Sequence, residues 1–156
     1  MTDLSIPFLE QQESELVLPS FDLTTSWTLG RLIVERALET GAGVAVDIRR
    51  GDHVLFRAML PGTTIDQQDW IRKKAAVVHR FEASSALVAL RLADVDVKGR
   101  GWLDARDYAL TGGSFPIRVA GTGVVGAVSA SGLTSEEDHT LVTDGIREYL
   151  RSVGRG

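Results

Sequence analysis

The pattern of apolar and polar positions along the chain predicts helices that alternate with β-hairpins. Apolar side chains recur at helical spacing in long segments, for example at Leu29, Ile33 and Ala37, and runs rich in β-branched residues lie between these segments. The predicted helices begin near Ser5, Asp22, Asp66, Ser84 and Thr134, and the predicted strands are Leu16–Leu18, Val44–Ile48, Val54–Met59, Phe115–Val119 and Val124–Ser131. Hairpins separated by helices favour an antiparallel sheet with helices packed against it. The expected fold class is therefore α+β with two layers.

Capping residues predict where two long helices begin. Thr64 with Gln67, and Thr134 with Glu137, have the spacing of a capping box, in which each side chain bonds the backbone N–H of the other residue. The acidic residues after Thr134 also suit the positive end of a helix dipole. Both helix starts are therefore predicted from local sequence alone.

Composition narrows the class of protein. The chain has 156 residues, of which 44% are hydrophobic, and 17 basic against 21 acidic side chains, which gives a formal charge of −4. The absence of cysteine excludes thiol catalysis and thiolate metal sites. A net negative charge argues against nucleic-acid binding, and no apolar stretch approaches the length of a membrane span. We expect a single domain over residues 1–156, with residues 1–20 as an N-terminal extension, in the cytoplasm.

A lysine occupies the apolar face of the predicted helix at 66–81. At 100° per residue, Lys74 falls near the middle of the face that carries Ala75, whereas Arg72 and His79 share the opposite face, which is typical of a solvated or assembly surface. A buried ammonium group requires a carboxylate, carbonyl oxygens or an anionic ligand, or else it loses its proton. Three interpretations are open. The amine reaches the surface at a groove or subunit boundary, it forms a structural ion pair, or it serves a ligand or a reaction.

A histidine lies on the inward face of the last predicted helix. His139 is followed by Val142 and Ile146 at the spacing of a buried stripe. A helix N-terminus disfavours the imidazolium form, so we expect a neutral ring. Such a ring is either a core histidine bonded to a backbone carbonyl, or a group that shuttles a proton or binds a metal. His53 and His79 are not at metal-ligand spacing with it, so no metal site is expected.

The glycine motifs favour turns over nucleotide binding. Residues 121–126 match G-x-G-x-x-G, but that fingerprint requires a helix after it, whereas the residues from Val124 onward continue as a strand. Gly112 and Gly113 also open into a strand and lack the following Lys-Ser/Thr of a P-loop. They permit a positive φ or the close approach of a ligand or of another backbone segment. No G-x-S-x-G elbow is present, which argues against a serine hydrolase.

Several short motifs occur together in this chain. They are Trp70-Ile71-Arg72-Lys73-Lys74, His79-Arg80-Phe81, Ser84-Ser85, Gly112-Gly113-Ser114-Phe115-Pro116-Ile117, Gly126, Ser131-Gly132-Leu133 and Glu137-Asp138-His139. In these motifs the chain resembles the UPF0303 proteins, a branch of the haem-degrading-domain (GlcG/HbpS-like) superfamily. The resemblance spans about residues 66–150, with a looser fit from Thr24 onward.

The resemblance implies a profilin-like α+β fold, a closed homo-oligomer and a relationship with proteins that bind or degrade haem. It also implies a ligand-binding cluster made of Trp70, Arg72, Lys74, Gly112, Gly113, Phe115, Pro116, Ser131, Gly132, Asp138 and His139. We therefore expect these residues to lie near one another.

Three functions are open at this point. The first is a small-ligand-binding or accessory protein that holds an anionic molecule beside Lys74, His139 and the backbone of Gly112 and Gly113, with haem as a candidate cofactor. The second is an enzyme, either haem-degrading or one that uses His139 and Lys74 for acid–base chemistry. The third is an oligomeric assembly protein without catalysis, because Pro116 favours an edge strand that a neighbouring subunit can pair with. No nucleic-acid or membrane partner is expected.

Overall fold

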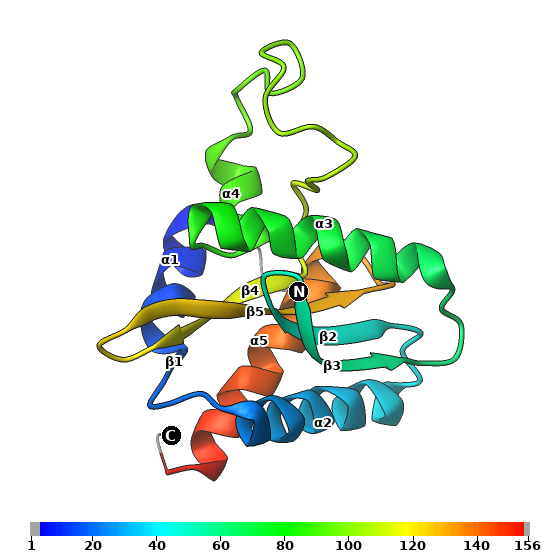
Figure 1. Cartoon of the computed structure of the whole chain (residues 1–156), viewed down its shortest axis with the longest axis vertical. Coiled ribbons are helices and arrows are strands. Elements are labelled where there is room, and N and C mark those ends of the chain that lie inside the picture. The colour runs from blue at the N-terminus through cyan, green and yellow to red at the C-terminus, as the bar shows by residue number, and fades with distance from the viewer. Residues whose placement is uncertain (1–3, 155–156) are drawn as a thin grey trace.

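The computed structural model of the chain describes residues 4–154, and a five-stranded sheet runs through its middle (Figure 1). The strands are β1 (Val17–Leu18), β2 (Ala45–Arg50), β3 (His53–Met59), β4 (Ser114–Val119) and β5 (Gly123–Ser131), in the spatial order β1-β4-β5-β2-β3. The helices are α1 (Ile6–Glu15), α2 (Leu23–Thr40), α3 (Ile65–Phe81), α4 (Ser85–Arg91) and α5 (Ser135–Ser152). The predicted α+β, profilin-like fold class is confirmed. In detail the sheet is mixed, because β1 pairs in parallel with β4 while the other pairs are antiparallel.

The predicted helix starts are confirmed by the capping contacts. Thr64 and Gln67 form the capping box of α3, and Thr134 and Glu137 form that of α5. Each box satisfies two backbone N–H groups that a helix start otherwise leaves without partners. No helix within residues 4–154 combines the length and the apolar character that crossing a bilayer requires.

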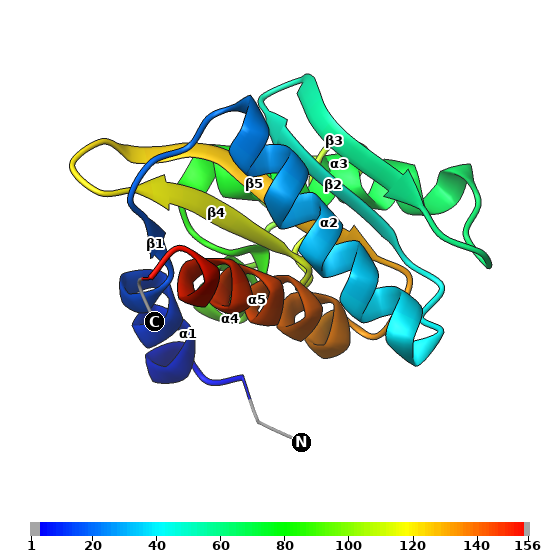
Figure 2. The ribbon, with the colours of Figure 1, turned by 90° about the horizontal axis from the view of Figure 1, so that it is seen from below.

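Helices cover both faces of the sheet, so α3 adds a third layer to the expected two. Helices α2 and α5 lie side by side on one face (Figure 2), and α3 crosses the opposite face (Figure 1). The main apolar core lies between the sheet and the α2–α5 pair, and includes Ile33, Val46, Phe115, Val128 and Ile146. A Cβ atom at Gly145 would lie 2.3 Å from Ile33 Cγ1, so this glycine allows α5 to approach α2 closely.

The prediction that Phe115–Val119 is an edge strand is wrong. This segment belongs to β4, which lies between β1 and β5. The pairing with β1 begins only at Arg118, so Pro116 lies just before it. The missing N–H of the proline is thus tolerated where β1 forms no ladder, and the short β1 takes the edge position.

Candidate functional site

The face of the sheet beneath α3 carries a row of polar side chains. The strand register places Ser114 of β4 opposite Ser129 of β5, Ser129 opposite Asp47 of β2, and Asp47 opposite Arg57 of β3. The Ser129 hydroxyl donates to Ser114 Oγ over 2.8 Å. Ala127, two residues before Ser129, packs against Ala75 and Val78 of α3, which identifies the face. One polar row therefore crosses four strands under this helix.

Asp47 is the centre of a charged cluster in that row. Its side chain is fully buried and accepts hydrogen bonds from the guanidinium groups of both Arg49 and Arg57. The Arg57 contact is 3.0 Å long, and Arg57 Nε is buried with no partner among the described residues. Two cations share one carboxylate, so the cluster retains one positive charge. Sequence reasoning missed these three residues, although a charged residue inside the β-branched run at 44–48 is a usable signal.

The two arginines border a cleft between the β2–β3 hairpin and α3. Two adjoining hollows of about 400 Å³ and about 660 Å³ form it, and both are lined by Arg49, Asp52 and Arg72. Arg57 lines the larger hollow, and Arg80 lines the smaller one. We call the two hollows together the arginine cleft. Its volumes fall within the range of about 300–1,000 Å³ that is typical of small-molecule sites.

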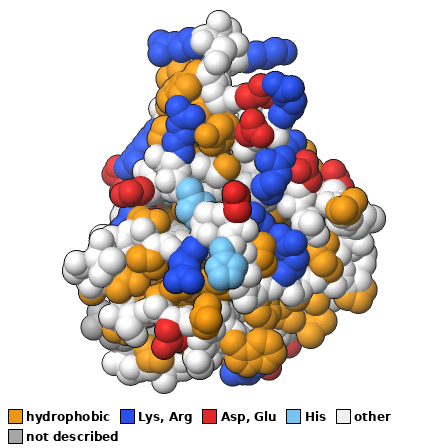
Figure 3. Space-filling model, in the orientation of Figure 1, with side chains coloured by type: hydrophobic (Ala, Val, Ile, Leu, Met, Phe, Trp, Pro, Cys, Tyr) orange, Lys and Arg blue, Asp and Glu red, His pale blue; other side chains and the backbone are white. Residues whose placement is uncertain are grey.

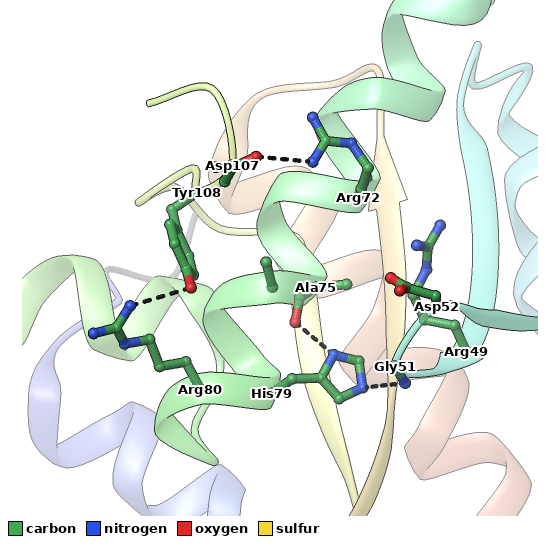
Figure 4. A pocket seen from close by; sticks show the side chains of 10 residues that line it. Arg49, Gly51, Asp52, Arg72, Ala75, His79, Arg80, Asp107 and Tyr108 are labelled. Carbon is green, nitrogen blue, oxygen red and sulfur yellow. Dashed lines mark hydrogen bonds and ion pairs between the residues drawn. The ribbon is translucent and has the colours of Figure 1, made fainter. Parts of the chain in front are cut away.

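A histidine ties the hairpin to α3 at the smaller hollow (Figure 4). The Gly51 N–H donates to His79 Nε2 over 3.0 Å, and His79 Nδ1 lies 2.8 Å from the Ala75 carbonyl oxygen. These contacts require the neutral tautomer with the proton on Nδ1, because a carbonyl oxygen only accepts. Both ring nitrogens are thus used within the chain, and His79 positions the hairpin against α3. That this helix face is an assembly surface stays a prediction.

Arginines 72 and 80 differ in how they are compensated. Arg72 is held by Asp69 at 3.0 Å, by Asp107 at 3.6 Å and by a backbone carbonyl. Arg80 donates to the Tyr108 hydroxyl over 3.1 Å, and its guanidinium carbon lies 5.4 Å from the centre of that ring. No carboxylate within residues 4–154 forms an ion pair with Arg80, so its charge remains available. Figure 3 shows Lys and Arg side chains interspersed with Asp and Glu over this face, with histidines among them.

Lys74 forms a buried ion pair on the same side of the sheet. Its Nζ atom lies 3.1 Å from Asp138 Oδ2 and 3.1 Å from the Ala130 carbonyl oxygen, and the two side chains are 4% and 2% exposed. Burial lowers the pKa of Lys74 and raises the pKa of Asp138, and their mutual attraction opposes both shifts. The ion pair of the second interpretation is present, and the amine does not reach bulk solvent as the first assumed. The third interpretation, a ligand or a reaction, stays a prediction.

A third hollow adjoins this pair and shares only Asp66 with the lining of the arginine cleft. The Lys74 cavity, as we name it, has a volume of about 320 Å³. Its lining residues are Asp66, Gln67, Trp70, Lys74, Thr111, Ser131, Gly132, Leu133, Ser135 and Asp138. Gly113 adopts φ +136°, and a Cβ atom there would lie 2.6 Å from Lys74 Nζ, so this glycine makes room for the ammonium group.

His139 lies elsewhere, in the core between α5 and α1. Its side chain is 1% exposed, its Nε2 lies 2.7 Å from Gln12 Oε1, and its ring centre is 5.9 Å from that of Phe115. Burial lowers its pKa to about 4, which confirms the expected neutral ring. The partner is a side-chain amide and not the backbone carbonyl that the core interpretation assumed. Nδ1 has no partner among the described residues.

The predicted ligand-binding cluster is therefore divided among separate places. Trp70, Lys74, Ser131, Gly132 and Asp138 share the Lys74 cavity. Gly113 contacts Lys74, and Gly112 packs against the Ser135 carbonyl. Arg72 lines the arginine cleft, whereas Phe115 and His139 are buried without lining either hollow, and Pro116 lies in β4. That these residues bind a ligand stays a prediction.

The fold defines the general class of protein. The crystal structure of Ybr137w matches this chain with a TM-score of 0.88 and 26% identity, over 95% of this chain and 89% of that one. The crystal structure of the PduOC:Heme complex matches with a TM-score of 0.67 and 18% identity, over 82% and 94% of the two chains. An α+β domain of the profilin-like kind, shared with these proteins, is the class that the fold establishes.

The sequence comparisons are more specific. Residues 21–147 match the family described as haem degrading protein HbpS-like. A UPF0303 protein of Streptomyces avermitilis is 46% identical over 151 residues, which cover 94% of this chain and 91% of the relative. The chain belongs to the UPF0303 proteins of the HbpS-like family, as its motifs suggested.

Proposed function

We propose that this protein binds a small anionic molecule, with carboxylate or phosphate groups, in the arginine cleft. The observation that carries the proposal is the sharing of the buried Asp47 carboxylate by Arg49 and Arg57, which leaves one positive charge at the wall of the cleft. The planar guanidinium group donates two parallel hydrogen bonds to such anions. The Arg57 side chain is 27% exposed and lines the larger hollow, so its guanidinium group can reach an anion bound there.

The acidic residues of the cleft restrict where the anion lies. Asp69 pairs with Arg72 and Lys73, and Asp107 pairs with Arg72, so two cations compensate these two carboxylates. Asp52 lines both hollows and repels a bound anion. Asp66 lines the larger hollow as well. We therefore place the anion directly against the guanidinium groups of Arg49 and Arg57 in the larger hollow.

Haem is one candidate anion, because the family is described as haem-degrading and PduOC has a haem complex. Haem iron in proteins is usually held by His, Cys, Met or Tyr. In the arginine cleft, both nitrogens of His79 are bonded and the Tyr108 oxygen accepts from Arg80. The Lys74 cavity has none of these residue types in its lining. The arginine cleft offers donors for the carboxylates of a porphyrin, but neither lining offers a free ligand for its iron, so we derive no haem-degrading step.

Titration calorimetry with inorganic phosphate, citrate, haem and metal-free protoporphyrin tests the proposal. Arg57→Gln removes a charged hydrogen bond, so affinity for the bound anion should fall roughly tenfold or more. Arg31→Gln is the matched control, since Arg31 forms an exposed pair with Glu35 on α2. Equal affinity in the two variants would place the ligand elsewhere. Haem and metal-free protoporphyrin should bind equally well, and a strong preference for haem would show that the protein supplies an iron ligand.

A further inference from the structure

The Lys74 cavity contains a donor that the fold does not use. An ammonium group has three N–H donors. The structure provides acceptors for two of them, the Ala130 carbonyl oxygen and Asp138 Oδ2. Lys74 is also one of the residues that line the cavity, so its side chain borders this space.

The lining of the cavity selects a neutral ligand. Asp66 and Asp138 outnumber the single cation Lys74, so an added anion is disfavoured. Hydroxyl groups of Thr111, Ser131 and Ser135, together with the indole of Trp70, provide polar contacts and an apolar wall. A small uncharged molecule with one acceptor oxygen fits this combination.

We propose that Lys74 captures a small neutral aldehyde or ketone from the Lys74 cavity as a protonated imine, with Asp138 as its proton acceptor and donor. The carboxylate of Asp138, 3.1 Å away, first takes one proton from the ammonium group. The amine lone pair then attacks the carbonyl carbon, and a proton moves from nitrogen to the former carbonyl oxygen. Asp138 returns its proton to this hydroxyl, which leaves as water while the C=N bond forms.

The charges balance throughout this sequence. The starting ammonium–carboxylate pair and the final iminium–carboxylate pair each carry one positive and one negative charge, and one water molecule is released. Asp138 therefore keeps its cationic partner in the product. No oxidant, reductant or metal is required.

Burial supports the first step. It lowers the pKa of Lys74 and raises the pKa of Asp138, and both shifts favour transfer of the proton to the carboxylate. Asp138 also accepts a hydrogen bond from the Leu133 N–H over 3.0 Å, which fixes the orientation of its carboxyl group. The geometry thus places a proton acceptor and a nucleophile side by side at a cavity wall.

Reductive alkylation tests this proposal on the unmodified protein. The chain has only three lysines, Lys73, Lys74 and Lys98, so peptide mapping can assign every modified side chain. The folded protein is treated with limiting propanal and cyanoborohydride at neutral pH, and the same reaction is run in denaturing urea. Lys74 should be modified faster than the exposed Lys98. The ratio of the two rates should be about tenfold for each unit by which the pKa of Lys74 lies below that of an ordinary lysine. In urea the two should react alike.

Matched variants identify the reacting group. Lys74→Arg should abolish the fast modification, and Lys73→Arg, one residue away on α3, should leave it intact. The proposal is overturned if Lys98 reacts as fast as Lys74 in the folded protein. The result is independent of the arginine cleft, because the two hollows share only Asp66 and anion titration does not involve Lys74.

Discussion

The two faces of the sheet are built from the same strands and packed in different ways. Towards α2 and α5, the strands present apolar side chains such as Phe115 and Val128, which are fully buried. Towards α3, the alternate positions carry Asp47, Ser114 and Ser129, which are also fully buried. Successive side chains of a strand point to opposite faces, so one sequence can supply both surfaces.

The two faces of the sheet differ in what they contribute: one supplies most of the apolar burial, and the other borders the proposed ligand sites. Burial of apolar side chains is the main favourable term in folding, and the α2–α5 face contains most of it. A buried charge costs free energy unless it is paired, so the α3 face is held by pairs such as Lys74–Asp138 and Asp47–Arg57. Both hollows that we assign to ligands border this polar face.

The largest expected change in the free energy of unfolding comes from a comparison of one variant on each face. Phe115→Ala should reduce the free energy of unfolding by about 3–5 kcal/mol, because it leaves a cavity in the apolar core. Ser129→Ala on the polar face should cost only about 1 kcal/mol, the value of one neutral hydrogen bond. Urea denaturation measures both. If the serine variant loses as much stability as the phenylalanine variant, the division between the faces does not hold.

Next in size is the loss of one partner from the buried ion pair. Lys74→Met should cost about 3 kcal/mol, because the Asp138 carboxylate stays buried without its cation. Adding Asp138→Asn removes that charge and keeps an oxygen that can accept from the Leu133 N–H. The double variant should therefore be more stable than Lys74→Met alone. A double variant that is less stable would show that the carboxylate does not depend on Lys74.

The polar exception on the apolar side, His139, should make stability depend on pH. Its pKa is about 4 in the folded protein, below the ordinary histidine value of 6.5, so the unfolded chain binds the proton more readily. Stability should be full above about pH 6.5 and fall as the pH drops towards 4, by up to about 3 kcal/mol. Denaturation curves over this range should show the dependence. His139→Gln should flatten it, and an unchanged slope in that variant would assign the effect to other groups.

The smallest effect concerns binding and leaves stability alone. Asp52→Asn removes a repelling carboxylate from the arginine cleft, and should raise affinity for the bound anion about two- to fivefold, as expected for a surface charge worth about 0.5–1 kcal/mol. The midpoint of urea unfolding should not move. Weaker binding in this variant would mean that Asp52 contacts the ligand directly.

Local signals predicted the elements well. The Thr64 and Thr134 capping boxes define helix starts because their partners are three residues away in the chain. The inward position of His139 also followed from helical spacing. The arginine cleft was missed, because a charged residue within a strand usually faces solvent, and only the pairing of β2 with β3 shows that Asp47 meets Arg57.

The sequence by itself determined the fold class, the positions of the helices and strands, and the presence of a lysine and a histidine on apolar helix faces. Only the tertiary structure decided their partners. Asp138 is 64 residues from Lys74, and Gln12 is 127 residues from His139. Caps and turns depend on contacts within a few residues, whereas these pairs form only when α3, α5 and α1 have packed around the sheet. The physical reason is that a buried polar group takes whichever partner the packing brings within hydrogen-bonding distance.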